Sequence, residues 1–174
     1  TASSPEVRPA VTLGHSSVDR ISRMSGFNAR AWTVTQPDAN GVRYVGGDFT
    51  SFQAWDTGRA ARVALSDGAV DATFPKVSGD VDAVESDGNG GYVIGGMFGS
   101  VDGQTRTRLA HIRADGSLNP DFAPVVNHRV QSISVSGSVV VIGGLFTDVN
   151  GSTRNRLAAL NLSDGSLLDW DPAA

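Results

Sequence analysis

The sequence lacks several features that would assign it to a well-defined class. It contains no cysteine, which excludes disulfide frameworks, thiolate zinc sites and cysteine nucleophiles. No run approaches the ~20 apolar residues that a membrane-spanning helix needs, so no membrane insertion is expected. The first residues, TASSPEVRP, lack the apolar segment of a signal peptide, as would a mature chain without its leader.

The charged residues do not follow the pattern of a nucleic-acid-binding protein. The net charge is −4, and only Lys76 among the 14 basic residues is a lysine. The arginines are scattered along the chain, whereas binding of nucleic acid requires a basic stripe or patch. We therefore expect no nucleic acid among the partners.

A helical period is also missing, and short strands take its place. Residues 16–27, SSVDRISRMSGF, come nearest to a helix but do not keep the period for three turns. VDAVES and VQSISV instead alternate apolar and polar residues, the pattern of a strand with one buried face. GYVIGG and VVVIGG are continuous β-branched runs, which favour strands buried on both faces. The sequence therefore predicts an all-β chain.

Six residues occur three times at nearly equal intervals, as YVGGDF, VIGGMF and VIGGLF. Gly95 follows Gly46 by 49 positions, and Gly143 follows Gly95 by 48. A phenylalanine, an arginine, an Asp-Gly pair and an aromatic residue then recur in the same order. The phenylalanines are Phe49, Phe98 and Phe146; the arginines are Arg59, Arg108 and Arg156; the final aromatics are Phe74, Phe122 and Trp170. A recurrence at this period is the signature of a repeat architecture.

Each unit contains four short candidate strands in about 48 residues, the size of one β-propeller blade. The Gly-Gly pair ends a buried strand, where a bare backbone permits a bulge or the close approach of a neighbouring chain. The phenylalanine that follows is expected to turn back into the core. We expect an all-β, β-propeller-type array of about three four-stranded blades; the alternative is a β-trefoil-like closure.

The phrases VIGGLFTDVNGSTRNRLAALNLSDGSLLDWDP and IGGMFGSVDGQTRTRLAHIRADGSLNPDFAP closely resemble the delta-60 repeat of bacterial propeller-like domains. The resemblance covers roughly residues 30–172 and implies a β-propeller in large, usually extracellular or surface-associated bacterial proteins. It implies no known catalytic residues. The first copy departs from the pattern, because SFQAWDTGR replaces SVDGQTRTR and DVNGSTRNR, with Ala54 at the turn glycine.

These registers divide the chain into an N-terminal segment, 1–27, and repeats at 28–74, 75–122 and 123–174. Residues 1–27 look like the end of a preceding blade, with Phe27 in the place of Phe74. Propellers close with 4–8 blades, and three stacked units would leave an apolar face bare. The expected partners are therefore further repeats of a longer chain or a homo-oligomer that completes the ring.

The recurring polar residues favour structural roles. Arg59, Arg108 and Arg156, with Arg106 and Arg154, fit contacts between blades better than a ring of anion-binding guanidinium groups, since equivalent residues serve what all units share. The Asp-Gly and Asn-Gly loops supply no set of carboxylates spaced for calcium, and turn chemistry explains them. No metal or cofactor is expected. His15, His111 and His128 occupy non-equivalent positions, and no catalytic constellation is visible.

Differences between copies indicate where a specific task would lie. The remodelled loop at 52–58 contains Gln53, Trp55, Asp56 and Thr57, and His128 lies in another divergent stretch. Aromatic residues with polar neighbours form contact platforms for sugars or proteins, although Trp55 would equally pack over a neighbouring blade. We predict a non-catalytic binding or architectural module of a bacterial surface, secreted or virion-fibre protein that contacts protein or glycan.

The competing class is a glycan-active enzyme with a pocket formed by loops of different repeats. Two carboxylates roughly 5–10 Å apart in a cleft would favour that class. A flat face of loops bearing aromatic side chains without such a pair would favour binding.

Overall fold

The computed structural model describes residues 28–37, 41–52, 55–56, 58–64, 66–71 and 74–171. The strands in this part form antiparallel sheets, one principal sheet in each repeat. The three sheets consist of β1 (Ala31–Val34), β2 (Val42–Gly47) and β5 (Ala60–Ala64); β6 (Val77–Ser86), β7 (Tyr92–Val101) and β9 (Leu109–Ile112); and β10 (Val130–Ser136), β11 (Val139–Gly144) and β14 (Leu157–Asn161). Among the described residues no helix is long and apolar enough to cross a membrane.

The fourth segment of each repeat joins its sheet through a single bridge. The three bridges are equivalent and pair Val63 with Val70, Ile112 with Leu118, and Leu160 with Leu167. Each repeat also has a small hairpin that the sequence did not predict, placed between the recurring phenylalanine and arginine. These hairpins are β3 (Ser51–Phe52) with β4 (Trp55–Asp56), the end of β7 with β8 (Gln104–Thr105), and β12 (Asp148–Val149) with β13 (Ser152–Thr153).

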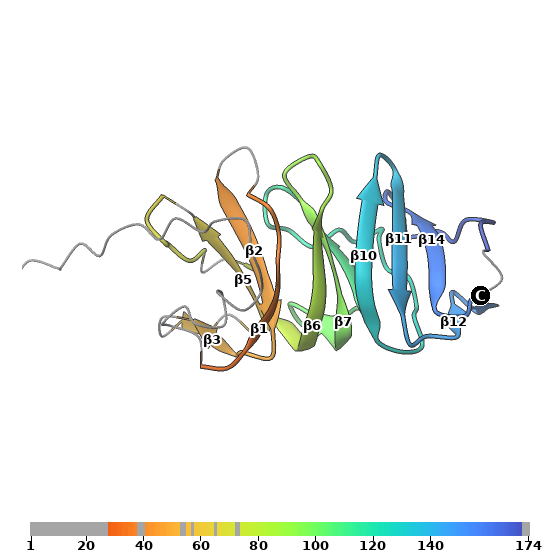
Figure 1. Cartoon of the computed structure of the whole chain (residues 1–174), viewed down its shortest axis with the longest axis horizontal. Coiled ribbons are helices and arrows are strands. Elements are labelled where there is room, and N and C mark those ends of the chain that lie inside the picture. The colour runs from red at the N-terminus through yellow and green to blue at the C-terminus, as the bar shows by residue number, and fades with distance from the viewer. Residues whose placement is uncertain are drawn as a thin grey trace, which may run out of the picture.

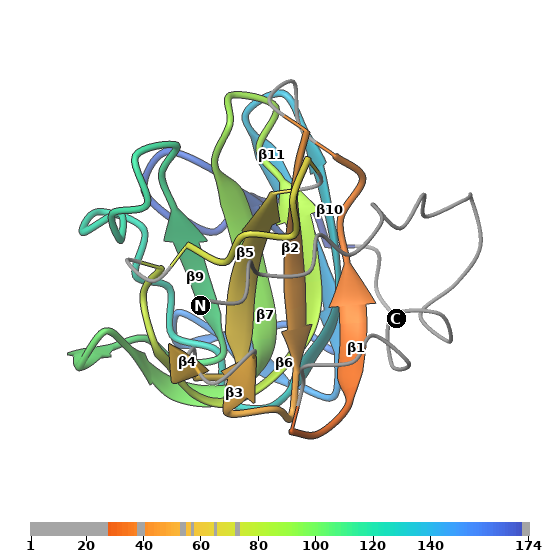
Figure 2. The same cartoon turned by 90° about the vertical axis from the view of Figure 1, so that its left-hand side faces the viewer.

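The three sheets stand in a row and pack face to face, as Figures 1 and 2 show from two directions. The apolar core therefore lies between sheets. One cluster joins the first and second repeats and another joins the second and third, while a smaller one lies on the first sheet. At the first junction the Tyr44 and Tyr92 rings lie 3.5 Å apart, and Phe74 stacks on Tyr92. This arrangement of separate, stacked sheets is that of propeller blades.

The alternative trefoil would place strands of all three units in one barrel. In the described residues, no strand ladder joins two repeats, and the one backbone pairing across a repeat boundary is an isolated bridge between Thr107 and Val125. The all-β, propeller-type architecture is therefore confirmed.

The Gly-Gly pairs have two separate physical functions. A Cβ atom on Gly47, Gly96 or Gly144 would lie within 2.2 Å of a backbone carbonyl oxygen at or just before the adjacent strand of the same sheet. Rotation of a side chain could not remove this clash, because the oxygen belongs to the backbone. The strand pairing shifts register beside each of these glycines, so the second glycine permits the bulge. All three recurring phenylalanines are buried. Both expectations from the sequence are confirmed.

The first glycine of each pair instead receives the next sheet. A Cβ on Gly46 would lie 2.5 Å from Val81 Cγ1, and one on Gly95 would lie 2.7 Å from Val130 Cγ1. Val81 and Val130 belong to the first strands of the second and third sheets. The two glycines thus let the following blade approach closely.

The third sheet is covered differently from the second. Val93 and Leu109 of the second sheet are fully buried, whereas their equivalents Val141 and Leu157 are half-buried. Trp170 is 47% exposed, although its equivalents Phe74 and Phe122 are 5% and 0% exposed. Within the described residues, no core cluster lies on the side of the third sheet that faces away from the second.

Candidate functional site

The structure describes three of the five predicted binding residues, Trp55, Asp56 and His128. Trp55 and Asp56 lie on β4, where they pair with Phe52 and Ser51 through the backbone, while Gln53 and Thr57 lie outside the described residues. His128 is exposed and precedes β10 in the third repeat. The candidate binding surface remains a prediction.

The structure instead reveals a cluster of charges that joins all three repeats. Arg59 Nη1 lies 2.8 Å from Asp80 Oδ1, and Arg129 Nη2 lies 3.1 Å from Asp80 Oδ2. Arg129 Nε lies a further 3.4 Å from Asp82 Oδ2. Arg59 precedes β5, the two aspartates lie on β6, and Arg129 precedes β10. We call these four residues the junction cluster.

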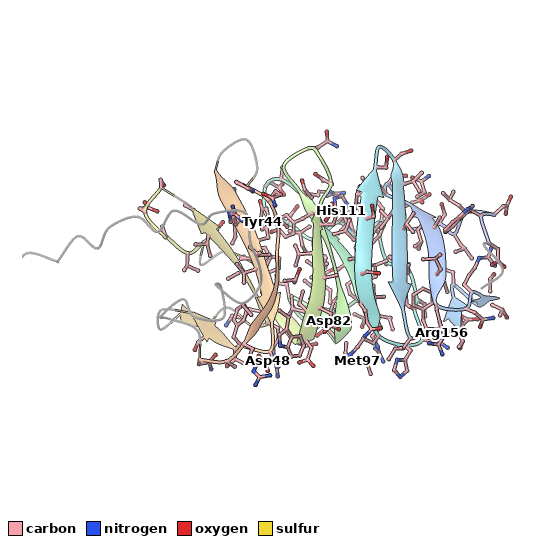
Figure 3. All side chains as sticks on the ribbon, viewed as in Figure 1. Tyr44, Asp48, Asp82, Met97, His111 and Arg156 are labelled. Atoms are coloured by element: carbon pink, nitrogen blue, oxygen red, sulfur yellow. The ribbon has the colours of Figure 1, made fainter. Side chains whose placement is uncertain are left out.

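The fold places the junction cluster along one edge of the row of sheets. Figure 3 shows Asp82 near the lower edge, as are Asp48, Met97 and Arg156, with Tyr44 toward the opposite, upper edge. Asp80 directly precedes Val81, the residue that packs on Gly46, so the carboxylate reaches the boundary between two blades. A single strand, β6, thereby carries the acidic groups for contacts on both of its sides.

The electrostatics of the junction cluster differ between its two carboxylates. Each oxygen of Asp80 accepts a hydrogen bond from a different arginine. The side chain of Asp82 is only 12% exposed, and burial raises its pKa; Arg129 opposes that shift and Asp80 adds to it. A carboxyl pair in unlike environments is what an acid–base mechanism uses. Here, however, Arg59 and Arg129 each bond one oxygen of Asp80, an arrangement that holds neighbouring blades together.

His111 is a buried residue of a type that often acts as a catalytic acid or base, and both of its ring nitrogens are hydrogen-bonded. Nε2 lies 3.0 Å from Asp87 Oδ2, and Nδ1 lies 3.1 Å from Asn119 Nδ2. Asn119 Oδ1 accepts a hydrogen bond from Arg113, so its amide group faces the ring as a donor. His111 therefore accepts at Nδ1 and donates to Asp87 from Nε2. No ring nitrogen is left to activate a nucleophile.

The partner of His111 explains why the repeat does not require a histidine. Arg62 occupies the equivalent position in the first repeat and lies 2.9 Å from Asp71, the equivalent of Asn119. In the third repeat the same two positions are Ala159 and Leu168, which are joined through the backbone. The two side chains thus form an ion pair in the first repeat and a polar pair in the second, and both are apolar in the third. The residue types at the two positions therefore change together. Such matched variation indicates a structural role.

The recurring arginines also have structural contacts. Arg59 reaches the next repeat, whereas Arg108 donates to Phe98 O in its own repeat. Arg106 and Arg154 donate to the carbonyl groups of the equivalent residues Asn119 and Leu168. Of these four arginines, Arg59 confirms the predicted contact with the next blade. For Arg106, Arg108 and Arg154 the prediction was wrong, because their side chains bond carbonyl groups of their own repeats.

A further recurring contact was missed in the sequence because its residue type changes. Asn127 bonds Thr147 through both its amide nitrogen and its oxygen, and Asn28 bonds Thr50 in the same way. In the second repeat the corresponding contact joins the Ser78 and Ser100 hydroxyl groups. Each contact fastens the entry of a sheet to its small hairpin. His128 lies next to this fastening but takes no part in it.

Comparison with known proteins supports the fold. A family model described as a β-propeller domain of unknown function, DUF5122, matches residues 88–122 and 137–167. No curated protein matches the chain. The matched segments lie in the second and third repeats, and the departing first copy lies outside them. The chain is similar to this propeller family over its two regular repeats.

Proposed function

We propose that the chain is a non-catalytic binding or architectural module of the delta-60 type, from a bacterial surface, secreted or virion-fibre protein. Its architectural role is to pack against a further blade through the free face of its third sheet. Its inter-strand loops contact protein or glycan. This setting is extracellular or at the cell surface, and the further blade belongs to another repeat of the same type.

One observation carries the architectural part of the proposal. Residues that are buried between blades in the first two repeats are exposed or half-buried in the third, as Trp170, Val141 and Leu157 show. Burial of apolar surface contributes roughly 25 cal/mol per Å², so covering this face would stabilise the third repeat. Repeat proteins require such a cover at each end of a stack.

The non-catalytic part rests on how the buried His111 and the half-buried Asp80 are used. His111 is bonded at both nitrogens, and Asp80 is bonded at both oxygens. These groups hold strands and blades together, which leaves neither free to take a proton from a substrate. The competing proposal, a glycan-active enzyme, would need a carboxylic acid such as Asp82, whose burial raises its pKa, together with a second carboxylate in a cleft.

The experiment extends the chain by one more repeat. Residues 77–122 are appended directly after Ala174, which keeps the interval from Gly165 equal to that between Gly116 and Val126. Hydrogen exchange of β11 and β14 is then compared in the parent and extended chains. We expect the added repeat to slow exchange there, because it covers Val141 and Leu157.

The matched control carries Leu157→Asp in the extended chain. A carboxylate at this position would have to be buried without a partner, so the protection should disappear. Unchanged exchange of β11 and β14 after the extension would contradict the architectural proposal.

A further inference from the structure

The free face of the third sheet has features that specify the blade it receives. The chemistry of the incoming strand can be inferred from them if the proposed function holds. Two junctions within the chain show how such a strand is received: β6 packs on the first sheet and β10 packs on the second. The residues of the first sheet that contact β6 have equivalents in the third sheet.

The first shared feature is steric. Val81 and Val130 lie over Gly46 and Gly95, which have no side chain to obstruct them. Gly143 holds the equivalent position in the third sheet. A Cβ on Gly143 would meet only atoms of its own repeat, of which the nearest is the rotatable Ser132 Oγ. The third sheet therefore keeps the space into which a β-branched side chain of another blade fits.

The second feature is electrostatic. Arg59 of the first sheet bonds Asp80, the residue that directly precedes Val81. In the second sheet the equivalent arginine, Arg108, would face Arg129, which directly precedes Val130, and it bonds its own Phe98 carbonyl group instead. The recurring arginine thus forms an ion pair with the next blade where that blade has an acidic residue at the facing position.

Among the described residues, the arginine of the third sheet has no such partner. Arg156 is exposed, and its side chain makes no hydrogen bond or ion pair among the described residues. Its φ is 67°, close to the 70° of Arg108. A left-handed conformation is unfavourable for a residue with a side chain. Arg156 holds the position in the third sheet that Arg59 holds in the first, although Arg59 is not left-handed.

We propose that the third sheet selects an incoming blade whose first strand carries an acidic residue followed by a β-branched residue. The acid pairs with Arg156, and the β-branched side chain fits over Gly143. The first strand of a second copy of this chain is a poor match. It carries Arg30 and Ala31 at these positions, which would set two guanidinium groups together and leave the space over Gly143 unfilled. The occupant is thus a further repeat of the Asp80–Val81 type.

The test uses the extended chain with charge variants. The appended copy of residues 77–122 carries either its native Asp80 or Asp80→Arg, and each is joined to a parent with Arg156 or with Arg156→Glu. Like charges placed together at an interface cost several kcal/mol. We expect exchange of β11 and β14 to be slowed more than about tenfold by the native copy and hardly at all by the Asp80→Arg copy. Arg156→Glu should reverse this order.

The possible outcomes separate the two proposals. If both copies slow exchange equally, the selection by charge is wrong and the architectural function stands. If neither copy slows exchange, both proposals fail. The Arg156→Glu parent without an extension is the control, and its exchange should match that of the unchanged chain, since Arg156 has no partner there.

Discussion

The two glycines Gly95 and Gly143 occupy equivalent positions, yet replacing each by alanine should have opposite effects. At Gly95 the added carbon would lie 2.7 Å from Val130 Cγ1 and 2.9 Å from Ile133 Cδ1. Favourable carbon contacts lie at about 3.5–4.0 Å, so β10 would have to retreat. Overpacking of this kind costs about 1–3 kcal/mol.

A smaller opposing effect comes from the unfolded state. Gly95 is not in a left-handed conformation, so alanine fits the backbone and removes freedom from the unfolded chain, which contributes about 0.4–1 kcal/mol. The net expectation for Gly95→Ala is a loss of about 1–2 kcal/mol. For Gly143→Ala the Ser132 hydroxyl group rotates away, and the next atoms lie 3.7 Å and 3.8 Å distant. That variant should be neutral or slightly stabilised.

Urea unfolding monitored by circular dichroism measures both free energies, and an unchanged m value verifies that the unfolding reaction is the same. A second variant, Val130→Ala, distinguishes a local steric clash from a general effect. Combined with Gly95→Ala, it should cost less than the sum of the two single changes, since the clash is with Val130 itself. If Gly95→Ala and Gly143→Ala change the unfolding free energy by amounts that agree within about 0.5 kcal/mol, the first glycine is not needed for the close packing of the next blade.

Two further predictions concern residues singled out in the sequence. Arg108 has φ 70°, and its side chain donates a hydrogen bond to Phe98 O; Arg108→Gly should therefore be more stable in thermal unfolding than Arg108→Ala, by about 1 kcal/mol. Equal stabilities would mean that the left-handed backbone imposes no cost. Trp55→Ala should change the unfolding free energy by less than about 0.5 kcal/mol if the ring is a contact platform, and Trp55→Phe should lower the fraction of tryptophan fluorescence quenched by acrylamide. An unchanged quenched fraction would contradict that role.

The sequence predicted those parts of the fold in which the same residue type recurs. The recurring Gly-Gly pairs located the bulged strands, and Phe49, Phe98 and Phe146 are buried as expected. These residues perform the same physical task in each repeat, so alignment of the copies reveals them. The small hairpins were not predicted, because each of them pairs only two residues of one strand with two of the other, too few to show a period.

The junction cluster illustrates what this kind of alignment misses. Arg30, Asp80 and Arg129 occupy equivalent positions in successive repeats, but their charges differ. The partners are distant in sequence, with 21 positions between Arg59 and Asp80 and 49 between Asp80 and Arg129. The sign of the charge at this position alternates from one repeat to the next, which lets neighbouring blades attract each other. An alignment that looks for identical residues does not detect this pattern.

Variation between the copies is therefore of two kinds, and only one of them points to a ligand. Position 111 varies together with position 119, so its differences are absorbed within each blade. The residue directly after each Gly-Gly pair varies without such a partner. It is Asp48, then Met97 and Leu145, whose side chains are 37% and 44% exposed. Met97 lies near the same edge of the row of sheets as Asp82 in Figure 3. Exposed apolar side chains beside charged groups are typical of contact surfaces. A search for the ligand should therefore examine this end of the blades together with His128, whose exposed ring takes no part in the structural contacts around it.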